Sequence, residues 1–102
     1  MLGRSRFADV IRRQLDVFET DYAVDLREIG ELQAKWNAAE RDETEEAFGD
    51  YVDAVDSTAD ILASMRDRFA STLSDSDAQR FEREFNRLAR RRLPVLGRGL
   101  DE

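Results

Sequence analysis

The sequence predicts an all-α protein with a single domain over residues 1–93. We expect a long antiparallel helical hairpin with a shorter third helix, a three-helix bundle that dimerises into a larger helical bundle. Apolar residues recur every three or four positions along most of the chain, which is the spacing of one face of an α-helix. The only proline is Pro94, and there are five glycines in 102 residues, so little interrupts a helix. A chain of this length suits one compact domain.

The first predicted helix spans residues 7–40, about 51 Å at 1.5 Å per residue. Its core-facing positions follow one heptad register: Ala8, Ile11, Leu15, Phe18, Tyr22, Ile29, Leu32, Trp36 and Ala39. Asp25 interrupts that register, and a buried carboxylate is costly unless it is paired or hydrated. We therefore expect Asp25 to lie at an edge of the core or to fix the helix register.

The second and third helices are predicted over residues 44–72 and 76–92. Acidic residues near position 44 favour a helix start, because they face the positive end of the helix dipole. Ser76 and Gln79 have the spacing of a capping box for the third helix. That helix must end before Pro94. Residues 94–102 are predicted to be a flexible tail.

The unequal helix lengths predict an interaction surface. The third helix reaches along residues 7–24 of the first, where we expect it to fill the groove beside a second apolar row of Val10, Val17 and Val24. Residues 25–57 are left as a two-helix arm, and an exposed apolar patch is typical of an interface. The predicted interface residues are Ile29, Leu32, Trp36, Phe48, Tyr51, Val52 and Val55. A second copy is the favoured partner, giving a homodimer, and the alternatives are another helical protein or an arm that closes on itself.

Charge is unevenly distributed in this acidic chain, whose net charge is −7. No Lys or Arg occurs between Asp42 and Met65, and we interpret the carboxylates there as a solvated face, with no metal site. The third helix carries an arginine stripe that could contact an anion: Arg80, Arg83, Arg87, Arg90 and Arg91. Its end is expected to be neutralised within the chain by Asp56 and Asp60. Contact between the arginine face of one copy and the acidic face of another is an alternative, whereas nucleic acid is disfavoured by the net charge.

Composition excludes several classes of site. The chain has no cysteine and no histidine, so disulfides, thiol nucleophiles, zinc sites and histidine catalysis are absent. We predict no catalytic residue and no cofactor, and hence no enzyme. No segment reaches the ~18 apolar residues of a membrane span, and no apolar stretch follows the basic residues near the N-terminus. A cytoplasmic location is therefore expected.

Two short resemblances suggest other functions. The run Ile11-Arg12-Arg13-Gln14-Leu15-Asp16 resembles the opening of the small all-helical chorismate mutases, and the resemblance implies a cationic pocket with Arg27 and Lys35. Their spacing departs from that family, and the acidic second helix would repel a dicarboxylate substrate. Trp36-Asn37-Ala38 is similar to the turn of the Trp-x-Gly family of small secreted hairpins, with alanine in place of glycine.

Overall fold

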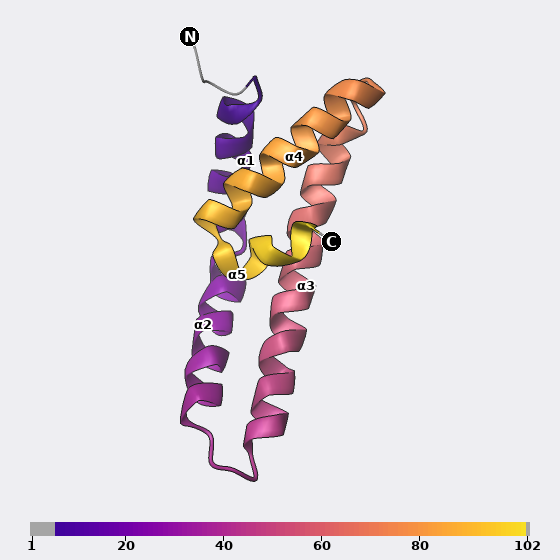
Figure 1. The fold of residues 1–102 in the computed structure, drawn as a ribbon. Coiled ribbons are helices and arrows are strands. Elements are labelled where there is room, and N and C mark those ends of the chain that lie inside the picture. The colour runs from indigo at the N-terminus through magenta and orange to yellow at the C-terminus, as the bar shows by residue number, and fades with distance from the viewer. Residues whose placement is uncertain (1–5, 102) are drawn as a thin grey trace.

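The structure, a computed structural model, describes residues 6–101 (Figure 1). Over that range its regular elements are all helical and no strand occurs, which confirms the all-α prediction. The elements are α1 (Ala8–Asp21), α2 (Ala23–Ala38), α3 (Thr44–Ala70), α4 (Asp75–Arg92), α5 (Pro94–Gly97) and the 3-10 helix η1 (Arg98–Asp101).

Two parts of the molecule differ in how many helices they contain. In the lower part of Figure 1, α2 and α3 pack against each other as an antiparallel hairpin joined by a short loop. In the upper part, α1 and the end of α3 diverge, and α4 crosses them from the end of α3 toward α1. The result is an elongated shape of 52 × 23 × 22 Å.

The hydrophobic core lies in the upper part, where α1, α3, α4 and α5 meet. Its largest fully buried side chains are Phe18, Phe81, Phe85, Ile11, Leu15, Leu62 and Leu96. The Phe81 ring is central, because its centroid lies 5.5 Å from that of Phe7, 4.8 Å from that of Phe69 and 5.8 Å from that of Phe85. The hairpin in the lower part therefore extends away from the core as an arm, which we define as residues 25–57 and which joins the core at Ile29.

The first predicted helix, 7–40, is divided at Tyr22 in the structure. Tyr22 has φ −116° and ψ 31°, outside the helical range, although its N–H still donates to the carbonyl of Phe18 at 2.9 Å. The Tyr22 and Phe18 rings pack with centroids 5.1 Å apart, which anchors the bend. Asp25 consequently lies in the first turn of α2, where the helix dipole favours a carboxylate. Its irregular place in the heptad register marks a helix start.

The other helix bounds are close to the sequence expectation. α3 ends two residues before the predicted position 72, and α4 begins one residue before the predicted position 76. The cap of α4 differs from the expected Ser76–Gln79 box. Ser74 is the N-cap, and its hydroxyl accepts a hydrogen bond from the Asp77 N–H at 3.3 Å.

The C-terminal segment, residues 93–101, packs onto the core, whereas the sequence predicted a flexible tail over 94–102. Leu96 and Leu100 are buried, and α5 contacts both α3 and α4. Pro94 occupies the first turn of α5, a position that suits proline because its missing N–H has no partner there anyway. Apolar residues three and four positions apart continue after Pro94, which explains why the chain resumes a helix. Residue 102 lies outside the described range.

In the valine row of the first helix, Val10 is half-buried against the core, whereas the other two valines are not covered as expected. Val17 is 46% exposed and Val24 is 67% exposed. α4 instead approaches α1 on the side of Leu15, Asp16 and Glu19. At 100° per residue, that side lies roughly opposite Val17 on the helix.

Candidate interaction surfaces

The seven predicted interface residues lie together on the arm, but only part of the group is open to solvent. Ile29 is buried as part of the hydrophobic core, and Phe48 is 43% exposed. The rest are half-buried: Leu32, Trp36, Tyr51, Val52 and Val55. The Trp36 ring packs against Phe48 with centroids 4.7 Å apart and stacks on Tyr51 at 5.4 Å. The aromatic residues at the tip of the arm therefore pack against one another and leave Phe48 partly accessible to solvent.

An apolar strip runs from this tip toward the core along one side of α3. We define it as Phe48, Val52 and Val55. With Ala59 and Arg66, these residues fall within a sector of about 60° at 100° per residue. Arg66 donates to the Leu100 carbonyl at 3.4 Å, which places η1 on this side of α3. The C-terminal segment thus covers the inner end of this side. Farther toward the tip, the described residues form only two helices, α2 and α3 (Figure 1).

The opposite side of the arm is acidic. Asp25 and Glu28 of α2 face Asp50 and Asp53 of α3 across a groove of about 510 Å³. On α3, Asp50 and Asp53 lie roughly opposite the apolar strip. Within residues 6–101, no group of three or more acidic side chains is arranged to hold a metal ion. The arm is therefore apolar on one side and carboxylate-lined on the other.

The predicted arginine stripe lies on the outer surface of α4. Arg80, Arg83, Arg87, Arg90 and Arg91 are all exposed. Arg87 forms an ion pair with Glu84, one turn earlier on the same helix. The expected neutralisation by Asp56 and Asp60 does not occur, since neither forms an ion pair in the described part of the chain. Contact of the stripe with an external anion stays a prediction.

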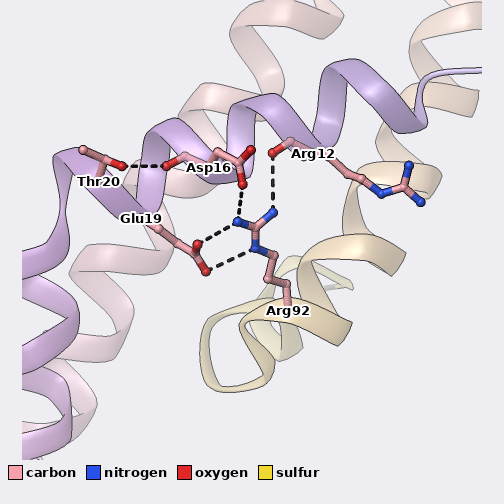
Figure 2. Close-up of polar contacts among 5 residues, drawn as sticks. All are labelled: Arg12, Asp16, Glu19, Thr20 and Arg92. Carbon is pink, nitrogen blue, oxygen red and sulfur yellow. Dashed lines mark hydrogen bonds and ion pairs between the residues drawn. The ribbon is translucent and has the colours of Figure 1, made fainter.

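Arg92 joins the end of α4 to α1 (Figure 2). Its guanidinium forms a two-point contact with Glu19: Nε lies 3.2 Å and Nη2 2.7 Å from the two carboxylate oxygens. Nη2 also donates to Asp16, and Nη1 donates to the Arg12 carbonyl at 3.5 Å. The hydrogen bonds that Arg92 donates to Glu19 and then to Asp16 raise its pKa, so it stays charged and holds the end of α4 to α1.

A second polar cluster fixes the C-terminal segment, and sequence reasoning missed it. Arg66 donates to the Asn86 side-chain oxygen at 2.9 Å and to the Leu100 carbonyl. Asn86 in turn donates to the same carbonyl at 3.1 Å. One feature of the sequence could have predicted this cluster: Arg66 lies on the same face of its helix as the apolar strip. A cation on such a partly buried face needs polar partners.

The residues of the chorismate-mutase resemblance are dispersed. Arg12 lies on α1 and is paired with Asp9 at 3.5 Å. Arg27 is exposed on α2. Lys35, near the other end of α2, lines a hollow of about 320 Å³ with Glu43, Glu46 and Asp50. The described structure therefore does not bring the three cations into one pocket.

Two further observations bear on the class of protein. None of the helices in residues 6–101 is both long and apolar enough to cross a membrane. Comparisons of the chain with protein-family models, curated proteins and solved structures give no match.

Proposed function

We propose that this protein is a small helical protein–protein interaction module that self-associates through the apolar strip of its arm. The observation that carries the proposal is the 43% exposure of Phe48 at the end of a half-buried valine strip on a two-helix arm. Large aromatic side chains contribute most of the energy at protein interfaces. Two arms packed strip to strip would form a four-helix bundle, in which each side of the strip gains a helical neighbour.

The position of the C-terminal segment supports this arrangement, because the segment packs on α3 as a partner arm would. It already covers the inner end of the same side of α3, where Leu96 and Leu100 are buried. A partner arm would continue that cover outward to the tip. Charged side chains flank the strip at the tip, since Arg41, Asp42 and Glu45 line one hollow with Phe48. An apolar centre with a charged rim is the usual anatomy of an interface.

Light scattering behind size exclusion tests the proposal. We expect a dimer that persists at ~1 M salt, because apolar association is not screened by ions. Phe48→Asp should convert the dimer to a monomer, since a carboxylate would be buried at the interface centre. Val17→Asp is the matched control, because Val17 is a similarly exposed apolar residue on the outer side of α1. A monomer at both low and high salt would contradict self-association, and dissociation by Val17→Asp alone would move the interface to α1.

A further inference from the structure

The chain carries two charged regions of opposite sign that do not neutralise each other. Between Asp42 and Asp60 there are eight acidic residues and no basic one: Asp42, Glu43, Glu45, Glu46, Asp50, Asp53, Asp56 and Asp60. None of them forms an ion pair within the described residues. Between Asn86 and Leu100 there are five arginines and no acidic residue: Arg87, Arg90, Arg91, Arg92 and Arg98.

We name the second region the arginine-rich end, and its charge is only partly satisfied within the chain. Arg87 pairs with Glu84, and Arg92 with Asp16 and Glu19. Arg91 and Arg98 are exposed and form no ion pair with another described residue. The arginine-rich end therefore presents two exposed guanidinium groups, those of Arg91 and Arg98, that have no carboxylate partner among the described residues.

The positions of the two regions relate them to the proposed dimer. The acidic tip, which we define as residues 42–46, is at the far end of the arm (Figure 1). The end of α4 and the C-terminal segment lie midway along the molecule, where the arm joins the core (Figure 1). The arm is about 20 Å long, since residues 25–38 of α2 rise 1.5 Å each. An arm laid antiparallel along another arm would therefore bring its tip to the partner's arginine-rich end.

We infer that the arginine-rich end is a docking surface for the acidic tip of a second copy, and that the dimer is antiparallel. This inference rests on the proposed self-association and specifies its orientation. In a parallel dimer, the two acidic tips would face each other, and like charges in contact oppose association. In the antiparallel dimer, the two copies are related by a two-fold axis, so each acidic tip contacts the arginine-rich end of the other copy. No surface is left to bind a third copy.

Charge reversal tests the orientation on the full-length chain. Arg91→Glu with Arg98→Glu should weaken dimerisation about tenfold at ~50 mM salt, an effect that should fade at high salt. Asp42→Arg with Glu45→Arg should weaken it similarly. The chain with all four substitutions should regain the original affinity, because each tip again meets an opposite charge. In a parallel dimer, the tips would meet only each other, so neither pair of substitutions alone would weaken binding.

A matched control separates local contact from net charge. Arg68→Glu with Arg80→Glu gives the same change in net charge, but both residues are exposed near the α3–α4 turn, at the end of the molecule away from the arm. The dimerisation affinity of this control variant should stay within about twofold of that of the original chain. A dimer that responds equally to the control and to the Arg91/Arg98 variant, or that is not restored by the four substitutions, overturns the orientation. A chain that is monomeric at all salt concentrations instead overturns the proposed function on which it rests.

Discussion

Arg92 connects parts of the chain that are 73 to 80 residues apart, through Glu19, Asp16 and the Arg12 carbonyl. The guanidinium is suited to this task because its planar fork meets both oxygens of Glu19 at once. Its side chain is 32% exposed and that of Asp16 is 66% exposed, so water screens much of the attraction. The contribution of the cluster is therefore positional: it fixes where α4 ends on α1.

Replacement of Arg92 should have a small effect that depends on geometry as well as charge. We expect Arg92→Ala to lower the free energy of unfolding by about 1 kcal/mol, and Arg92→Lys to recover only part of it, since an ammonium cannot contact Glu19 at two points. Urea denaturation at low and high salt measures both changes. Arg83→Ala, an exposed arginine of the same helix that forms no ion pair with a described residue, is the control and should stay within about 0.5 kcal/mol of the original. Equal stability of the Lys variant and the original chain would show that charge alone suffices.

At the scale of elements, α5 lies against α4 so closely that only glycine fits at the contact. A Cβ atom on Gly97 would lie 2.5 Å from the Arg90 Cα and 2.9 Å from the Ala89 carbonyl carbon. These are backbone atoms, so the clash cannot be relieved by turning a side chain. The whole C-terminal segment would have to move, which would disturb the burial of Leu96 and Leu100.

Gly97→Ala should therefore destabilise the protein by about 2 kcal/mol, the cost of overpacking a core contact. Gly99→Ala is a close control, because a Cβ there meets nothing within 4 Å. It should be neutral or slightly stabilising, since alanine restricts the unfolded chain. Thermal and urea denaturation give the stabilities, and limited proteolysis reports release of the C-terminal segment. Equal effects of the two substitutions would contradict the close approach of α5 to α4.

The same elements show how far the sequence could predict the structure. The apolar spacing indicates helices correctly, because local periodicity determines which face each helix buries. It could not reveal the bend at Tyr22, since nothing but the irregular Asp25 marks that position. It also missed the C-terminal segment, whose docking depends on long-range contacts of Arg66, Asn86 and Gly97. The sequence predicts a candidate interface on the arm, and packing between Trp36, Phe48 and Tyr51 decides which of its residues remain accessible.

At the scale of the whole molecule, the hydrophobic core and the proposed binding surface lie in different parts of the structure. The core occupies the part where α1, α3, α4 and α5 meet, and the arm extends from it in a molecule 52 Å long. A surface on the arm can therefore bind a partner without rearranging the core. The arm also contains the single tryptophan of the chain, Trp36, next to Phe48 at the tip. Its fluorescence consequently reports on the proposed interface alone.

Trp36 emission should shift to shorter wavelength as protein concentration rises through the dimerisation range, because a partner arm would exclude water from the half-buried ring. The shift should persist at ~1 M salt if apolar contact dominates the dimer. Phe48→Asp should abolish the concentration dependence while circular dichroism shows an unchanged helix content, whereas Val17→Asp should preserve it. Dimerisation seen by light scattering without any change in Trp36 emission would place the interface away from the tip. In that case the apolar strip would not be the surface that joins the two copies.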